Sequence, residues 1–153
     1  RAWLKGLNAR EIIRKNFQID YNADESLKNI VHALEKEGYI YTPSMDVGMQ
    51  YRDLMNELGD SDAIGFTIDM HATGNTSIGD VTAGPSVAPW RFGRSHIRVD
   101  ENYIFALEFV INSWIPEWGK RISISYEENA IVTGRGVEYI YPPQEKIILI
   151  SGK

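Results

Sequence analysis

The alternation of hydrophobic and polar residues predicts helices in the first part of the chain and strands in most of the remainder. In the clearest helix, Asn22 and Glu25 have the spacing of a capping box, and Gly38 stands where helices commonly end. Apolar stripes with helical spacing predict helices at 3–17, 22–38 and 44–58. Shorter apolar runs predict strands at 39–41, 63–71, 103–116, 121–133, 137–141 and 146–150. This order predicts an α+β fold, with the helices packed on one face of an antiparallel sheet.

Composition limits the class of protein. The chain has 153 residues, 43% of them hydrophobic, which is enough for one domain over 1–153. Its net charge of −5, with scattered lysines and arginines, argues against nucleic-acid binding. No apolar run approaches the roughly 20 residues of a membrane helix, and no signal peptide is visible, so we expect a cytoplasmic protein. The chain has no cysteine, so a metal would be held by oxygen and imidazole. It begins with Arg1, and we expect a segment of something longer.

An acidic residue interrupts the most hydrophobic predicted strand. Glu108 is the only charged residue between Tyr103 and Trp114, and its neighbours on both faces are mostly apolar. A strand of this kind is normally buried on both faces, where an ionised carboxylate costs roughly several kcal/mol unless it is paired or binds a metal. Glu108 therefore has two interpretations: a buried ion pair with an arginine such as Arg98 or Arg121, or a metal ligand.

Two further residues can join Glu108 in one site. In the next predicted strand, Glu127 alternates with Ser123 and Ser125, which are small and leave space on that face. His71 stands at the end of the predicted strand 63–71. A histidine and two carboxylates suit a divalent transition metal. The alternatives are a hydrogen-bonded surface histidine at 71 and a solvated strand end at 127.

Residues 72–98 are rich in Gly, Pro, Ser and Thr. A connection of this length is more often functional than idle. His96 lies in its basic part, GRSHIR, where it either lines a cleft or has no role.

Two runs of sequence carry a family resemblance. ALEFVI, at 106–111, and ISYEENAIVTGRGVEYI, at 124–140, resemble the C-terminal part of the catalytic domain of the creatinase and Xaa-Pro aminopeptidase family, the pita-bread metallopeptidases. HATGNTSIG, at 71–79, is similar to that family's histidine-glycine motif. The resemblance implies that the sheet is curved and that the chain is the C-terminal half of a longer pita-bread domain.

The resemblance also implies roles for individual residues, with His71, Glu108 and Glu127 as the catalytic set. Glu108 and Glu127 match the family's two metal-bridging glutamates, and His71 matches a histidine beside the metals. Asn75 stands at the position of the ligand histidine, and an amide oxygen is a poor replacement for imidazole on a transition metal. The family's two aspartate ligands precede the region covered here. His96 is the remaining candidate for contact with substrate.

In a complete site of this family, two divalent metals (Mn, Co or Zn) lower the pKa of a water and polarise the scissile carbonyl. Without the aspartates and the ligand histidine, the resemblance implies an incomplete dinuclear site and no Xaa-Pro cleavage by this chain alone. Two hypotheses stay open. The chain is part of a metallopeptidase-like protein, related to Xaa-Pro aminopeptidases and dipeptidases, that acts on a peptide substrate, or it is a non-catalytic relative that binds peptides or protein partners. The resemblance is compatible with a homodimer.

Overall fold

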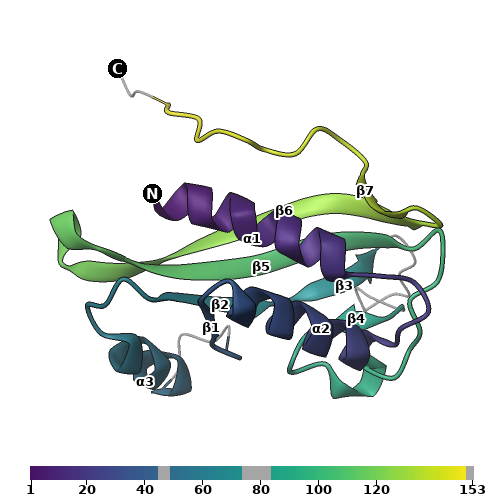
Figure 1. Cartoon of the computed structure of the whole chain (residues 1–153), viewed down its shortest axis with the longest axis horizontal. Helices are drawn as coiled ribbons and strands as arrows, with labels where there is room; N and C mark the ends of the chain where they lie inside the picture. Colours follow the sequence, from purple (N-terminus) through teal and green to yellow (C-terminus); the bar gives the residue numbers. More distant parts are fainter. Residues whose placement is uncertain (45–48, 74–83, 151–153) are drawn as a thin grey trace.

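Three helices and a seven-stranded sheet make up the described part of the chain, residues 1–44, 49–73 and 84–150 of a computed structural model (Figure 1). The helices are α1 (Ala2–Asn16), α2 (Ala23–Lys36) and α3 (Met49–Leu58), with 3-10 turns η1 (Phe92–Arg94) and η2 (Pro116–Trp118). The strands are β1 (Tyr39–Tyr41), β2 (Ile64–Ile68), β3 (Met70–Thr73), β4 (Ser86–Val87), β5 (Ile104–Ile115), β6 (Lys120–Thr133) and β7 (Gly136–Tyr139). The predicted α+β class is confirmed.

The long hairpin of β5 and β6 is the centre of the sheet. It pairs antiparallel along its whole length, from Ile104 opposite Ile131 to Ile115 opposite Lys120. Along the other edge of β5, β2 pairs with residues 109–112 and β3 with 104–106, so β2 and β3 lie end to end. β1 pairs parallel with β2, while the other pairings are antiparallel. The sheet is therefore mixed, rather than wholly antiparallel as predicted.

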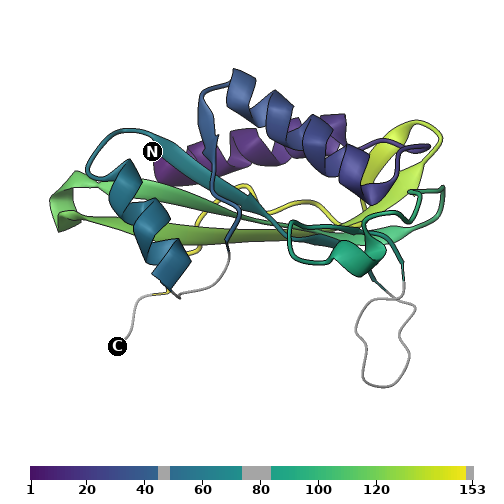
Figure 2. The ribbon, with the colours of Figure 1, turned by 90° about the horizontal axis from the view of Figure 1, so that it is seen from below.

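Helices α1 and α2 cover one face of the sheet (Figure 2). Phe17 of α1 packs edge-on against Phe105 of β5, with ring centroids 4.7 Å apart. Each large apolar side chain buried in this way contributes about 1.5–3 kcal/mol. The largest fully buried side chains include Ile13, Phe17, Ile30, Leu34, Phe66, Ile68, Phe105, Leu107, Phe109 and Ile111. They come from both helices and from β2 and β5, so the core lies between the helix layer and this face.

Local signals explain where α2 begins and ends. Asn22 Oδ1 accepts a hydrogen bond from the Glu25 backbone N–H, and Glu25 Oε2 accepts one from the Asn22 N–H, both at 2.9 Å. This is the predicted capping box. Gly38 follows the helix with φ of +83°, a left-handed conformation that residues with a side chain rarely adopt.

Gly6 allows α1 to approach the sheet closely. A Cβ added at this position would lie 2.0 Å from Cζ of Tyr126 on β6. Tyr126 stacks on Trp3 of the same helix, with ring centroids 4.8 Å apart. A glycine lowers helix propensity, but here it makes room for the tyrosine ring.

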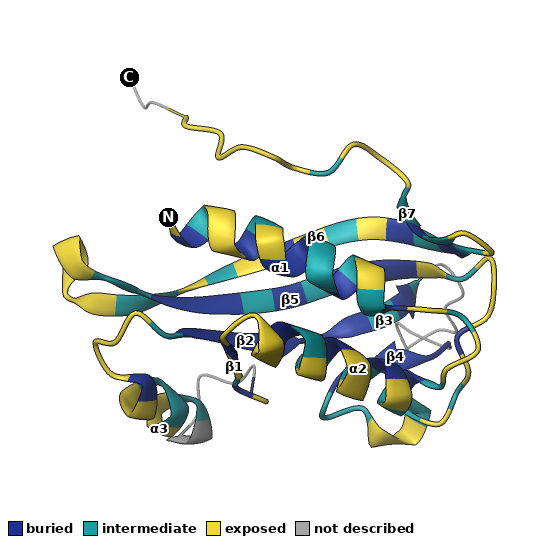
Figure 3. Ribbon diagram, viewed as in Figure 1, coloured by how far each residue is buried: buried dark blue, intermediate teal, exposed yellow. Residues whose placement is uncertain are grey.

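Three predictions about elements need correction. The predicted strand 63–71 is two strands, because Asp69 separates β2 from β3. Helix α3 reaches the face of the sheet opposite α1 and α2, because Tyr51 Oη donates a 3.0 Å hydrogen bond to Asn112 Oδ1 there. The predicted strand 146–150 is wrong, because these residues belong to no strand and are exposed (Figure 3).

The segment 72–98, predicted as a loop, contains the end of β3, strand β4 and η1, while 74–83 lie outside the described residues. The start of the third predicted helix, 45–48, also lies outside them. None of the helices in the described ranges is long and apolar enough to cross a membrane.

Candidate functional site

Glu108 and Glu127 lie directly opposite each other on neighbouring strands. They are partners in the antiparallel register of β5 and β6, so their side chains point to the same face of the sheet. Their chain neighbours Phe109 and Tyr126 point to the other face, where their rings stack with centroids 4.9 Å apart. The two glutamates therefore lie on the face opposite α1 and α2, which we call the glutamate face.

His71 lies on the glutamate face beside Glu108. β3 places it opposite Ala106, two residues before Glu108 on β5. His71 Nε2 is 3.8 Å from Glu108 Oε2, and the two side chains are 15% and 24% exposed. The three residues that the sequence singles out for a site are thus neighbours in space, and protonated His71 would form an ion pair with Glu108.

A second ion pair adjoins Glu108. Asp69 is buried, and its backbone N–H donates a 2.9 Å hydrogen bond to the Glu108 carbonyl. Its carboxylate accepts a hydrogen bond from Arg91 Nη1, and this contact is also a salt bridge. The same nitrogen lies 3.4 Å from Ser86 Oγ on β4. Arg91 therefore brings a fixed positive charge into the site.

Sequence reasoning missed the roles of Asp69 and Arg91. Asp69 carries the same signal as Glu108, because it is the only charged residue in the predicted strand 63–71. Arg91 is one of three arginines in the segment 91–98, and nothing in the sequence distinguishes it as the partner.

The charges of the site are coupled. Burial raises the pKa of Glu108 above its ordinary value, and the negative charge of Glu127 raises it further. The positive charges of His71 and Arg91 act in the opposite direction without cancelling the rise. Burial lowers the pKa of Arg91, while the charge of Glu108 raises it. Glu108 therefore holds a proton more readily than an ordinary glutamate.

The arginines proposed as partners of Glu108 from the sequence are engaged elsewhere. Arg98 pairs with Asp20 and Asp100. Arg121 donates to backbone carbonyls at the end of α3 and just after it, including Leu58 at 3.1 Å and Gly59 at 2.7 Å. The interpretation that either arginine neutralises Glu108 is wrong, and Arg91 is the nearby cation that influences it.

A polar network continues the glutamate face along the hairpin. Asn112 lies four residues after Glu108, on the same side of β5. Its Oδ1 accepts a 2.6 Å hydrogen bond from Ser123 Oγ. Tyr51 of α3 bonds to both residues. This face therefore presents hydroxyl and amide groups beside the two carboxyls.

The other two site candidates do not join this cluster. Asn75, at the ligand-histidine position, lies outside the described residues. His96 follows η1 and is exposed. Among the described residues, no hydrogen bond or ion pair links His96 to His71, Glu108 or Glu127.

The described donors do not fit a dinuclear metal centre. No group of three or more histidine, cysteine, aspartate or glutamate residues in the described ranges could hold a metal ion. Asp69, whose backbone N–H bonds to the Glu108 carbonyl, has its carboxylate in a salt bridge with Arg91. The Arg91 guanidinium supplies the positive charge that pairs with this buried carboxylate.

Comparisons with known proteins identify the fold. No model of a known protein family matches the sequence, and no curated protein matches it. The structure is similar to that of a dipeptidase from Pyrococcus horikoshii OT3, with a TM-score of 0.55 and 14% identity, over 97% of this chain and 32% of that chain. It is also similar to an X-Pro aminopeptidase from Thermotoga maritima MSB8, with a TM-score of 0.52 and 17% identity, over 94% of this chain and 31% of that chain. The chain thus has the fold of part of the pita-bread peptidases and spans about a third of their length.

Proposed function

We propose that this chain is the glutamate-bearing portion of a protein related to Xaa-Pro peptidases, with an acidic site too incomplete to cleave peptides alone. The observation that carries the proposal is the register of β5 and β6, in which Glu108 faces Glu127. His71, 3.8 Å from Glu108, adds to the argument. The likeness to a dipeptidase and an X-Pro aminopeptidase supports it at the level of fold. The substrate and activity of a whole protein of that length are part of the proposal.

The chemistry available to these residues is proton sharing and hydrogen bonding. Two carboxyls opposite each other disfavour joint ionisation, so the pair retains a proton more readily than a single glutamate does. A protonated carboxyl donates a hydrogen bond, and an ionised one accepts. The pair could therefore bind both the carbonyl and the N–H of a peptide backbone. Hydrolysis further needs an activated water, which in the peptidase family depends on metal ions.

The test of this proposal is hydrolysis by the purified chain. We expect no cleavage of Xaa-Pro peptides, even with added manganese, cobalt or zinc. The Glu127→Ala variant should be indistinguishable from the parent chain in this assay. Metal-dependent turnover that disappears in Glu127→Ala would contradict the proposal.

The second candidate function is peptide binding without catalysis, and the Arg91–Asp69 ion pair favours it. Arg91 pairs with Asp69 and its positive charge also acts on Glu108, so it partly offsets the negative charge of this face. A site of this kind would bind a proline-containing peptide equally well with and without a chelator. Titration of the labelled chain with a short Xaa-Pro peptide, followed by heteronuclear NMR, measures this binding.

A pair of matched variants locates the bound peptide. Glu127→Gln should weaken binding, because it removes a charged acceptor from the glutamate face. Glu117→Gln, in the exposed turn η2, makes the same chemical change away from this face and should leave binding unchanged. Equal affinity for both variants would place the peptide elsewhere and reject this candidate.

A further inference from the structure

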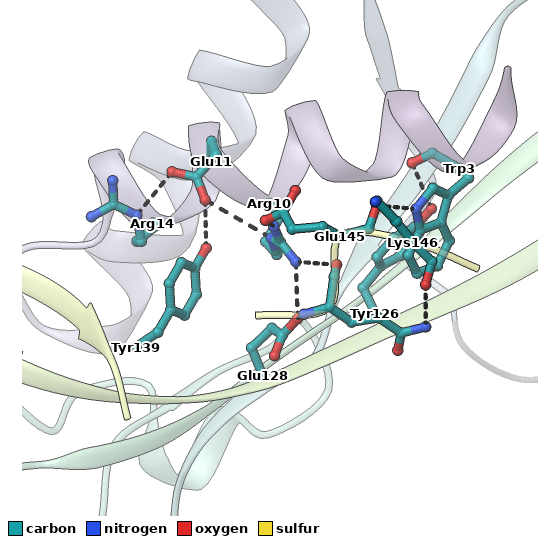
Figure 4. Close-up of polar contacts among 10 residues, drawn as sticks. Trp3, Arg10, Glu11, Arg14, Tyr126, Glu128, Tyr139, Glu145 and Lys146 are labelled. Carbon is teal, nitrogen blue, oxygen red and sulfur yellow. Dashed lines mark hydrogen bonds and ion pairs between the residues drawn. The ribbon is translucent and has the colours of Figure 1, made fainter. Parts of the chain in front are cut away.

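Residues 144–146 lie alongside α1, and we call them the strap (Figure 4). Arg10 of α1, itself 2% exposed, donates 2.9 Å hydrogen bonds to the Gln144 carbonyl and to Glu128 Oε1 on β6. The Gln144 N–H donates to the same Glu128 oxygen at 2.9 Å, and Arg10 Nη2 donates to Glu145 Oε1 at 2.8 Å. The backbone of Gln144 therefore joins α1 to β6 with both of its hydrogen-bonding groups.

The strap makes a second contact with α1, nearer the start of the helix. Trp3 Nε1 donates a 3.2 Å hydrogen bond to the Glu145 carbonyl. The Trp3 carbonyl in turn accepts a 3.0 Å bond from Tyr126 Oη on β6, and the two rings stack with centroids 4.8 Å apart. Trp3 and Arg10 are about two turns apart and so lie on the same side of the helix. The strap thus holds the side of α1 that contacts β6.

Glu127 stands between the two β6 residues that receive these contacts. Tyr126 and Glu128 are its neighbours in the chain, and both point to the helix side, whereas Glu127 points to the glutamate face. Tyr126 also stacks on Phe109, its partner in the register, with ring planes 8° apart. Phe109 is the chain neighbour of Glu108. The two glutamates are therefore backed, through the sheet, by residues that α1 and the strap hold in place.

The strap has two possible roles in this arrangement. If it only stabilises the fold, its loss lowers the free energy of unfolding and leaves the geometry of the glutamate face unchanged. If it positions the strands, its loss moves the two glutamates in a chain that is still folded. The second role is favoured because the contacts converge on the residues beside Glu127, directly at Glu128 and through Trp3 at Tyr126. Close packing and hydrogen bonds of this kind transmit displacements.

We propose that the strap positions Glu127 opposite Glu108 from the far side of the sheet, so that docking of the strap on α1 is coupled to peptide binding on the glutamate face. Tyr126 and Glu128 are the positioning residues, because they point away from that face. The coupling to binding rests on the proposed function, whereas the positioning of the two glutamates does not. Coupling between two sites is reciprocal, so a bound peptide should also hold the strap more firmly.

Heteronuclear NMR of the purified chain without ligand tests the positioning. Gln144→Pro removes the N–H that bonds to Glu128, and at this exposed residue proline interrupts no helix or strand. Gln144→Ala is the matched control, because it retains both backbone groups and loses only the side-chain bond to the Lys146 carbonyl. We expect Gln144→Pro to shift the amide signals of Glu108 and His71, which lie on the strands beyond β6, and Gln144→Ala to leave them in place.

A variant at the other strap contact makes this test independent of residue 144. Trp3→Phe removes the N–H that bonds to the Glu145 carbonyl and retains a ring to stack on Tyr126. It should move the Glu108 and His71 signals in the same direction as Gln144→Pro, because both variants release the same strap. Signals that stay at their parent positions in Gln144→Pro would overturn the proposal, as would shifts in unrelated directions.

Peptide affinity tests the coupling. Well below its unfolding temperature, Gln144→Pro should bind a short Xaa-Pro peptide at least about threefold more weakly than the parent, and Gln144→Ala should bind it equally well. Saturating peptide should slow hydrogen exchange of the Gln144 N–H in the parent by about the same factor. Equal affinities of the parent and Gln144→Pro would reject the coupling. If the parent binds no peptide although Gln144→Pro moves the Glu108 signal, the positioning stands and the proposed binding function fails.

Discussion

Two adjacent glutamates on β6 have opposite environments. Glu128 points to the helix side, where its carboxylate accepts from Arg10 Nη1 and from the Gln144 N–H, both at 2.9 Å. Glu127 points to the other face, where its partner in the register is another glutamate, Glu108. On the helix side of β6, a glutamate is thus paired with a positive charge. On the glutamate face, the neighbouring glutamate lies opposite another carboxyl.

The difference indicates which face is structural and which is available for binding. On the helix side, the negative charges of Glu128 and Glu145 are shared with one buried guanidinium, and every member contacts another. On the glutamate face, Asp69 takes the salt bridge of Arg91, and Glu108 and Glu127 are left facing each other. Like charges at short range are retained only at some cost in stability, and such positions are commonly functional.

The largest effect should come from breaking the helix-side cluster. Replacing Arg10 by Met retains much of the apolar stem but leaves Glu128 half-buried without a cation, and it releases 144–145. We expect a loss of about 2–4 kcal/mol in the free energy of unfolding. Urea denaturation measures it, and Arg135→Met, in the exposed turn before β7, is the control, with an expected change within about 0.5 kcal/mol. A loss at Arg10 no larger than at Arg135 would mean that the cluster is not structural.

The second prediction concerns the close approach of α1 on the same face. Gly6→Ala should destabilise the chain by about 1–3 kcal/mol, because the new Cβ overlaps the Tyr126 ring and alanine's better helix propensity recovers less than this. Gly93→Ala is the matched control, because a Cβ there meets nothing within 4 Å. Thermal denaturation should separate the two variants. A stabilising Gly6→Ala would show that Tyr126 moves aside freely.

The third prediction addresses the cation of the glutamate face. Arg91→Met leaves buried Asp69 without its partner, and because Arg91 is partly exposed the loss should be smaller, about 1–2 kcal/mol. Removing this positive charge also raises the pKa of Glu108 further, since Arg91 is one of the two charges that lower it. The deficit should therefore be larger at neutral pH than in mild acid. Equal deficits at both pH values would mean that Arg91 does not act on Glu108.

Most of the fold could be predicted because its signals are local. The capping box of Asn22 and Glu25, the helix end at Gly38 and the apolar faces of the β5–β6 hairpin depend on residues close in sequence. The split of 63–71 at Asp69 and the exposure of 146–150 depend on tertiary contacts, and the pattern of apolar residues contains neither. Four aliphatic residues in a row predict a strand, but they do not specify which strand lies beside it.

The candidate site was predictable to a similar extent. A carboxylate inside an apolar strand identifies Glu108, and the alternation on β6 leaves Glu127 or Glu128 as its neighbour. The resemblance favours Glu127, and the register of β5 and β6 places Glu127 directly opposite Glu108. The sequence suggested Arg98 or Arg121 as the counter-ion, whereas Arg91 is the cation beside Glu108, because loop residues carry no periodic signal that fixes their position in space.

The smallest effect, and the sharpest contrast with Arg10, is expected at Glu108. Its pKa in the folded chain is raised by burial and by Glu127 above the ordinary value of 4.5, so folding favours the protonated form. The stability that this gives is fully present below the unfolded pKa and is lost as pH rises through the folded pKa. At neutral pH the ionised group therefore opposes folding.

Glu108→Gln removes this penalty while retaining shape and hydrogen-bonding capacity, so the variant should be as stable as the parent or more stable at neutral pH. Its advantage should disappear below pH 4.5, where the parent is protonated in both states. Thermal melts across this pH range, with and without chelator, measure the difference. If Glu108 instead depended on an arginine as Glu128 does, the variant would lose roughly 3–5 kcal/mol under chelation, and the two faces of the hairpin would be alike.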